Sequence, residues 1–495
     1  MILDSFVFYH MAARFQRLFF SSPAAYAMIV EISRKKGMKR ITGLSFPQKM
    51  FGEKSMDETV KKNDLGSGPL VPTWFRLSLP VVLGSIVTIV YNLADTYFIA
   101  QTGNALLIAG VSLCAPLFMI LMAFGNIFGQ GGSSLISRLM GQRRPEDVKH
   151  VSAFCFWIAL AVGAVIGAIL FLLRDPFLSL LGSSEETLPF AREYGTVLLI
   201  GAPFIVVNFI HMNLLRCEGM AGLSMCGTVI GAVVNIILDP LLIPGMGAAG
   251  AAIATVIGYL CSDAFLLFIV LTKSASLSVR PTLKTNGAFL RDILSIGFTA
   301  AVTNIASSVC IILINQKLLS FGDDKIAAMG IVMKVTMIVQ MILVGFSFGG
   351  VPLFGFLSGA GEKEKTRRLL RFCLLFLCSF SLAMTALVVF TAEPLLRLIT
   401  PDAGLVATGV PMLRWNVAGS VFAGIVMLST CLCQASGRAL PALILSLSRQ
   451  GVVFLIVLLV AAALFGYPGI LASQCAADFL SALLAVGILR SVMKS

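Results

Sequence analysis

The chain has 495 residues, of which 58% are hydrophobic and only 12% are charged, and its mean hydropathy is +0.94. Soluble domains carry about 25% charged residues, so this composition excludes an ordinary soluble protein and predicts a multi-pass membrane protein. The formal net charge of +13 would suit a nucleic-acid partner, but in a membrane protein basic residues are first explained by topology.

The first 70 residues differ from the rest of the chain. They are mixed and basic, and their start, MILDSFVFYHMAARFQRLFF, lacks the long apolar core and small-residue cleavage site of a signal peptide. Two interpretations are open. The segment is a disordered or membrane-surface extension, or the start is placed too early and Met56, rather than Met1, is the initiator. We place no function in residues 1–55.

Apolar segments then follow one another to the end of the chain. Each is long enough to cross a hydrocarbon core about 30 Å thick. They predict an all-α membrane protein with twelve transmembrane helices, at 77–101, 106–137, 149–173, 193–215, 222–243, 248–272, 293–318, 326–356, 368–391, 405–432, 440–464 and 468–491.

The basic residues between these segments are unevenly distributed. When the connections are assigned alternately to the two sides, seventeen basic residues fall on one side and five on the other. The positive-inside rule makes the richer side cytoplasmic, which predicts that both termini are cytoplasmic. This topology explains the basic charge without nucleic acid, and we expect an integral protein of the cytoplasmic (inner) membrane.

The two halves of the chain resemble each other at a shift of about 220 residues. Gly125 and Gly129 in FGNIFGQGG then meet Gly345 and Gly349 in VGFSFGG. Each half holds six segments, an even number, so the repeats are parallel and are expected to form two lobes around a cavity. We predict an N-lobe at 71–275 and a C-lobe at 276–495, acting as a monomer.

Polar residues within the apolar segments are functional candidates by default. In the N-lobe, counting along the segments brings Asp95, Asn235, Asp239 and Thr255 to one layer in the outer half of the membrane. Asn235 and Asp239, in NIILDP, are four residues apart and share a helix face, so they can converge on one guest. In the C-lobe a shift of 218 places Val453 and Val457 at the positions of Asn235 and Asp239.

The proline after Asp239 predicts that the helix ends there, because the residue before a proline disfavours helical geometry. The C-terminal end of a helix favours a cation. Carboxylate, amide and hydroxyl oxygens suit a hard cation such as Na⁺, and the carboxylates could instead take up protons. We therefore expect Asp95, Asn235, Asp239 and Thr255 to couple Na⁺ or H⁺ to transport.

Two further acids and three basic residues, Lys334, Arg414 and Arg449, lie inside segments. Asp263 and Asp478 show no polar neighbour at helical spacing, which favours helix-packing contacts over a site. For Lys334 two interpretations are equally open: it lines a substrate path, or it pairs with an acid.

Several functional classes lack their motifs. The sequence has no GxxxxGK[ST] for an intrinsic ATP-driven pump and no evident nucleophile and base pairing, so we do not expect an enzyme. Three scattered histidines and cysteines without CxxC spacing indicate no zinc or iron site, no cofactor and no structural disulfide. The 21 methionines and 36 phenylalanines suit a plastic cavity for amphipathic cations, although ordinary helix packing explains most of them.

Five stretches in order resemble the multidrug and toxic compound extrusion (MATE) family, in its DinF-like and MepA-like prokaryotic branch. They are RLSLPVVLGSIVTIVYNLADTYFIAQTG, NLLRCEGMAGLSM, GAVVNIILDPLLI, GAAGAAIATVIG and QASGRALPALILSLSRQ. The sequence departs from the family in FGFLSGAGE after the eighth segment and in its long N-terminal extension.

The resemblance implies two six-helix lobes and an antiporter that expels cationic or amphipathic drugs in exchange for Na⁺ or H⁺. It assigns the first-helix aspartate of the family to Asp95 and the preceding tyrosine to Tyr91. It assigns the family's cation site to Asn235, Asp239 and Thr255. We add Asn92 and Lys334 to Tyr91 as candidate cavity residues, and we expect small amphipathic compounds and membrane lipids as partners.

Two other functions are kept as alternatives. A flippase for lipids or lipid-linked oligosaccharides would use the same fold, and Lys334 and Arg414 would suit its anionic cargo. A channel or a membrane receptor is the third interpretation, and the repeat together with the buried acids argues against it.

Overall fold

The computed structural model describes residue 65 and residues 68–281, 287–400 and 402–494. The extension predicted for 1–70 lies almost wholly outside these residues, and so do both candidate initiators. Regular structure in the described part is helical, with elements labelled α4 to α21 in chain order.

The helices of the first half start where capping residues stand. Asn104 accepts hydrogen bonds from the backbone N–H groups of Leu106 and Leu107, and Pro145 occupies the first turn of its helix. The bounds are α4 (Leu70–Ala100), α5 (Ala105–Leu113), α6 (Ala115–Gly141), α7 (Pro145–Leu172), α8 (Arg174–Leu180), α9 (Leu188–Ile200), α10 (Ala202–Cys217) and α11 (Ala221–Lys273).

The second half repeats this order with more interruptions. Asp402 caps its helix by accepting hydrogen bonds from the N–H groups of Gly404 and Leu405. The bounds are α12 (Gly287–Leu319), α13 (Asp323–Phe348), α14 (Val351–Gly359), α15 (Lys363–Phe390), α16 (Ala392–Ile399), α17 (Ala403–Ala418), α18 (Ser420–Ala435), α19 (Ala439–Gln450), α20 (Val452–Phe465) and α21 (Tyr467–Lys494).

The described helices supply the twelve predicted spans. Ten stretches are long and apolar enough to cross a membrane, and α9 with α10, bent by 53°, makes an eleventh. The twelfth comes from α11, whose 53 residues would be about 80 Å long, far more than one bilayer core. Its backbone turns back at Gly247, where φ is 54°, so α11 contains two spans.

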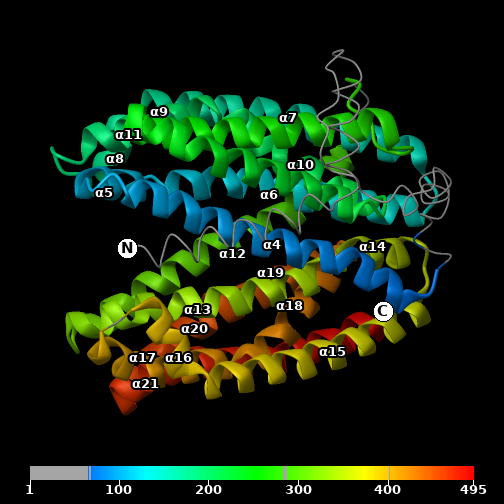
Figure 1. The fold of residues 1–495 in the computed structure, drawn as a ribbon. Helices are drawn as coiled ribbons and strands as arrows, with labels where there is room; N and C mark the ends of the chain where they lie inside the picture. The colour runs from blue at the N-terminus through cyan, green and yellow to red at the C-terminus, as the bar shows by residue number, and fades with distance from the viewer. Residues whose placement is uncertain (1–64, 66–67, 282–286, 401, 495) are drawn as a thin grey trace, which may run out of the picture. The chain divides into compact units, whose positions relative to one another are not determined.

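Two hydrophobic cores correspond to the two halves of the chain. One core joins side chains of α6, α7, α10 and the second half of α11, and the other joins α13, α15, α17, α18 and α21. Figure 1 shows the same division, with α5 to α11 in one group of helices and α13 to α21 in the other. Two groups built on separate cores are the structural basis of a two-lobe transporter.

The first helix of each half crosses to the other half. Trp74, Leu77 and Val82 of α4 are buried in the core of the second half. In return, Ile293 of α12 is buried in the core of the first half, where a side chain at Gly131 of α6 would overlap its backbone. The crossing keeps the two-fold relation of the repeat, because α4 and α12 occupy equivalent places in it.

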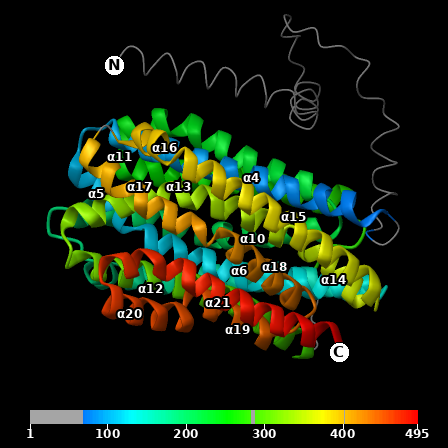
Figure 2. The ribbon, with the colours of Figure 1, turned by 90° about the horizontal axis from the view of Figure 1, so that it is seen from below.

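The halves are closed against each other where α6, α14 and α18 end, and we call this the basic end. Ser134 on α6 donates a 2.5 Å hydrogen bond to the carbonyl of Gln434 on α18. Arg138 forms a 3.2 Å ion pair with Asp292 on α12. A side chain at Gly359 of α14 would overlap the carbonyl of Arg138, so glycine permits this close approach. Figure 2 shows α14 at this end and α5, α16 and α20 at the other, which we call the outer end.

Candidate functional site

The candidate cation site depends on close packing between the two spans of α11. An added Cβ at Gly231 would lie 3.0 Å from the carbonyl oxygen of Gly258, and one at Gly258 would lie 2.8 Å from that of Gly231. Only glycine lets two helices approach this closely. One turn beyond this contact toward Gly247, the packing brings Asn235 of the first span next to Thr255 of the second.

Three of the predicted site residues are joined by hydrogen bonds. The Asn235 side-chain amide donates to Asp239 Oδ1 at 3.3 Å and to Thr255 Oγ1 at 3.4 Å. All three residues are buried, with exposed fractions of 2%, 0% and 7% for Asn235, Asp239 and Thr255. The structure thus brings an amide, a carboxylate and a hydroxyl from two spans to one buried point.

The fourth predicted residue, Asp95, faces this group from α4. Its carboxylate is close enough to that of Asp239 for the two negative charges to repel each other. Tyr91, one turn earlier on α4, lies near Tyr259 and within electrostatic range of both acids. Two carboxylates that share a low-dielectric site favour a guest that carries positive charge.

The oxygens needed to hold such a guest are present and unused. Asp95 Oδ1, Asn235 Oδ1 and Asp239 Oδ2 are buried and have no hydrogen-bond partner. A buried unpaired oxygen is costly, so the group invites a ligand that completes it. Carboxylate and amide oxygens are suitable ligands for a hard cation such as Na⁺, and a proton shared by the two carboxylates would serve as well.

One prediction about this site is wrong. The helix does not end at Asp239, because α11 continues through Pro240 and Pro244 as far as Gly247. Membrane helices tolerate proline when neighbouring groups satisfy the backbone, so the bias before proline was outweighed here. The helix end therefore gives no reason for a cation at Asp239, and the repulsion between the carboxylates and the unpaired oxygens give the reason instead.

Two of the three candidate cavity residues, Asn92 and Lys334, are exposed and do not join this buried group. Asn92 is exposed on α4, and its carbonyl accepts a 2.8 Å hydrogen bond from Thr96. Lys334 is exposed on α13, and within the described part of the chain no ion pair joins it to an acid. Of the two interpretations for Lys334, pairing with an acid is not seen.

The two remaining membrane acids make contacts between helices. Asp263 of α11 accepts a 2.9 Å hydrogen bond from Asn208 of α10. Asp478 of α21 forms a buried 2.9 Å ion pair with Arg449 of α19 and also accepts from Gln474 at 3.1 Å. Gln474 precedes Asp478 by four residues, so Asp478 does have a polar neighbour at helical spacing, and the sequence interpretation was wrong on this point.

Two tyrosines near the candidate site were not predicted from the sequence. Tyr194 of α9 lies near Thr255 and within electrostatic range of Asp95. Tyr259 lies one turn after Thr255 on the same face of α11, and this spacing could have identified it. Tyr194 carries no such signal, because only the fold brings α9 beside α11.

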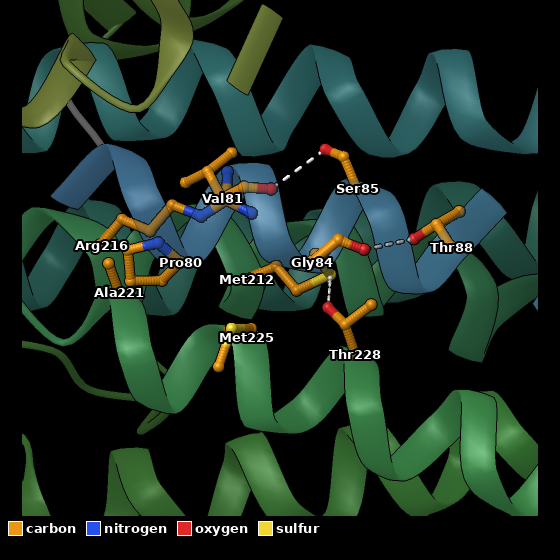
Figure 3. A pocket seen from close by; sticks show the side chains of 10 residues that line it. All are labelled: Pro80, Val81, Gly84, Ser85, Thr88, Met212, Arg216, Ala221, Met225 and Thr228. Atoms are coloured by element: carbon orange, nitrogen blue, oxygen red, sulfur yellow. Dashed lines mark hydrogen bonds between the residues drawn. The ribbon is translucent and has the colours of Figure 1, made fainter. Parts of the chain in front are cut away.

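A small pocket lies between α4, α10 and α11 on the side of the basic end (Figure 3). Its volume of about 70 Å³ is far below the roughly 300–1,000 Å³ of pockets that bind drug-sized ligands. Pro80 and Arg216 stand together at one end of it, and Thr88 and Thr228 at the other. The pocket is of a size for water molecules, so we do not assign cargo to it.

The second lobe lacks the acidic group. Gly247 and Gly466 both have positive φ, at 54° and 63°, and are 219 positions apart. This register places Phe454 and Leu458 at the positions of Asn235 and Asp239, which corrects the predicted Val453 and Val457 by one residue. Both are fully buried apolar side chains, so the asymmetry between the lobes remains.

Other metal and redox sites are not evident in the described residues. No group of three or more His, Cys, Asp or Glu side chains lies close enough to hold a metal ion within the ranges that the structure describes. All eleven cysteines of the chain are described, and each is a free thiol.

A family model described as MatE matches residues 80–241 and 299–460. The matched ranges have equal lengths and are offset by 219, the same register that the two glycine turns give. Together they cover more than half of the chain.

Individual proteins and structures agree with this match. The multidrug export protein MepA of Staphylococcus saprophyticus is 32% identical over 418 residues, which cover 83% of this chain and 91% of that protein. A crystal structure of MATE in complex with MaL6 has a TM-score of 0.83 at 25% identity, covering 88% of this chain and 99% of the other. The structure of an outward-facing multidrug resistance MATE family transporter has a TM-score of 0.80 at 25% identity. The match covers 85% of this chain and 96% of that chain.

Proposed function

The chain belongs to the MatE family of membrane transporters, and on that premise we propose that it expels amphipathic and cationic compounds in exchange for Na⁺ or H⁺. Its relatives and its fold make it a multidrug efflux transporter of the bacterial cytoplasmic membrane rather than an enzyme. The exchange itself, the coupling ion and the residues that bind it are the proposal.

One observation carries the coupling site. The group of Asp95, Asn235, Asp239 and Thr255 has two carboxylates that repel each other and three buried oxygens without hydrogen-bond partners. A cation or a proton relieves both defects at once. Unpaired polar atoms in a membrane core cost free energy. An ion-binding role therefore explains this group better than a role in helix packing.

The coupling mechanism that we propose is alternating access. The described state is closed at the basic end, where Ser134 contacts the backbone of Gln434 across the halves. An ion at the acidic site and a drug between the lobes would each favour a different arrangement of the two lobes. Only such differential affinity lets the inward flow of one drive the outward flow of the other.

The test is transport by purified protein in proteoliposomes with Na⁺ and pH gradients imposed separately. We expect drug movement to follow one of the two gradients in the wild type and to fall to background in the Asp95→Asn and Asp239→Asn variants. Asp175→Asn is the matched control, because Asp175 is partly exposed and pairs with Arg192 outside the site. Normal gradient-driven transport by both site variants would refute the assignment.

A lipid or lipid-linked oligosaccharide flippase is the second candidate. Lys334 and Arg414 are exposed on helices of the second lobe, and basic side chains would suit an anionic headgroup. Resistance assays separate the candidates: cells that express a drug exporter tolerate higher concentrations of toxic amphiphiles, whereas a dedicated flippase gives no such tolerance.

A further inference from the structure

Lys334 is a charged side chain at membrane depth that the coupling site does not use. It lies eleven residues after the start of α13 at Asp323, about 16 Å along the helix and inside the apolar span Asp324–Gly359. It is exposed, and no acid pairs with it in the part of the chain that the structure describes. A lysine at this depth is costly in lipid and is expected to face a water-filled space.

The face of α13 that carries Lys334 is the one that meets the other lobe. Lys334 and Gly345 are eleven residues, or three turns, apart and therefore lie on the same side of the helix. An added Cβ at Gly345 would lie 2.9 Å from the Cα of Val82 on α4. At Gly330, one turn beyond Lys334 on the same side, an added Cβ would meet nothing within 4 Å. This face is thus packed near the basic end and open near the outer end.

The contacts between α4 and α13 also identify the residue of α4 that faces Lys334. Gly345 faces Val82 and Gly349 faces Ser78, so the two helices are antiparallel, and the residue numbers of each facing pair sum to 427. Continuing this register toward the outer end places Lys334 opposite Leu93, two residues before Asp95.

Both surfaces are uncovered at this level. Leu93 and Tyr97 of α4 are 59% and 44% exposed, and Met337 and Ile338, one turn from Lys334, are 44% and 43% exposed. Exposed apolar and aromatic side chains of α4 and α13 therefore border the Lys334 ammonium group. The acidic pair does not neutralise this ammonium, because Asp95 points about 200° away from Leu93 around α4.

We infer that Lys334 binds an anionic group on the cargo, so that the transported compounds include amphiphiles with a carboxylate or phosphate, zwitterions among them. The ammonium attracts the anionic group, while Leu93, Tyr97, Met337 and Ile338 offer apolar contact to the rest of the molecule. This inference deepens the proposed efflux function and rests on it.

The test uses two dyes that differ only at one carboxyl group. Rhodamine 110 carries a free carboxylate and is zwitterionic, whereas rhodamine 123 is its methyl ester and is cationic. In proteoliposomes we expect Lys334→Met to lower rhodamine 110 transport about tenfold and to leave rhodamine 123 transport unchanged or raised. Lys334→Arg should restore rhodamine 110 transport, and Lys325→Met, on the first turn of the same helix, should change neither dye.

A fluorescent phosphatidylglycerol analogue in the same vesicles separates a drug from a lipid as the source of the anionic group. Lys334-dependent movement of the lipid with neither dye transported would refute drug efflux, and the inference, which rests on drug efflux, would fall with it. If both dyes are transported and Lys334→Met changes the transport of neither, the inference is overturned and the proposed function stands. The absence of transport for both dyes and the lipid in the wild type would overturn both.

Discussion

Thr255 contributes a single hydroxyl to the candidate site, and it does so from a different span than Asn235 and Asp239. Its hydroxyl can be removed without touching a charge and with almost no change in side-chain shape. Valine has nearly the same shape, so the Thr255→Val change isolates the oxygen from the packing. A change of this one side chain therefore tests the proposed ion site directly.

We expect Thr255→Val to raise the half-saturating concentration of the coupling ion about tenfold, which corresponds to about 1.4 kcal/mol for one lost ligand. The measurement is the ion dependence of drug transport in proteoliposomes. Thr272→Val, on the same helix, is the control, since the Thr272 hydroxyl bonds only to the carbonyl of its own helix at Phe268. An unchanged ion dependence in Thr255→Val would remove Thr255 from the site.

The Arg449–Asp478 pair makes a second prediction at this scale. Both side chains are buried and the pair holds α19 to α21. Removing one partner leaves a buried charge, so Asp478→Leu should destabilise the protein by about 3–5 kcal/mol, while Asp478→Leu with Arg449→Met should recover most of that loss. Denaturant unfolding in detergent measures both, and Asp175→Leu in an exposed pair is the control. A double variant as unstable as the single one would contradict this account.

At the scale of elements, α11 decides whether the site exists. Its two spans meet through Gly231 and Gly258, and Asn235 reaches Thr255 only because these glycines carry no side chain. The contact is backbone to backbone, so no rotamer change can make room for a larger residue. The geometry of the candidate site therefore depends on two glycines that are not themselves candidate ligands.

We expect Gly258→Val to abolish ion-dependent transport and to lower the melting temperature of the purified protein in detergent. The physical reason is the overlap of the added side chain with the Gly231 carbonyl, which separates the spans. Gly245→Val is the matched control on the same helix, because a Cβ there would meet nothing within 4 Å. Equal ion dependence and stability in the two variants would show that the close approach is not needed.

Much of the element scale was predictable from the sequence. The twelve spans follow from hydropathy, and the partners Asn235 and Asp239 follow from helical spacing. The continuation of α11 through Pro240 was not predictable, because a local backbone bias was overridden by packing against neighbouring spans. The ion pair of Arg449 with Asp478 was missed for a similar reason, since partners 29 residues apart meet only in the fold.

At the scale of the whole molecule, the state of the transporter is defined by contacts between its halves. Packing is tight at the basic end, through Gly345 and Gly349 against α4, and exposed side chains line the facing helices toward the outer end. The sequence predicted two lobes but not which end is closed. A single sequence supports both arrangements of an alternating-access protein, so only the structure distinguishes them.

Locking the basic end should stop transport. An added Cβ at Gly349 would lie 3.0 Å from Ser78 Cβ and 2.5 Å from Ser78 Cα, so the two helices must separate slightly to reach the Cβ separation of about 3.8 Å that a disulfide needs. We expect the Ser78→Cys and Gly349→Cys double variant to transport drug at background level when oxidised and to recover on reduction. Each single variant, treated identically, controls for the eleven native thiols. Full transport with the cross-link formed would show that this end need not open.

The crossing of α4 into the second core also sets an order of events during synthesis. Trp74 stacks on Phe346 and meets the edges of Phe372 and Phe376, the last of which lies 302 positions later in the chain. At translation rates of about 5–20 residues per second, these partners emerge roughly 15–60 s after Trp74. A nascent chain that ended at Lys273 would contain all four residues of the proposed ion site and still leave Trp74 without its aromatic partners in the second half of the chain.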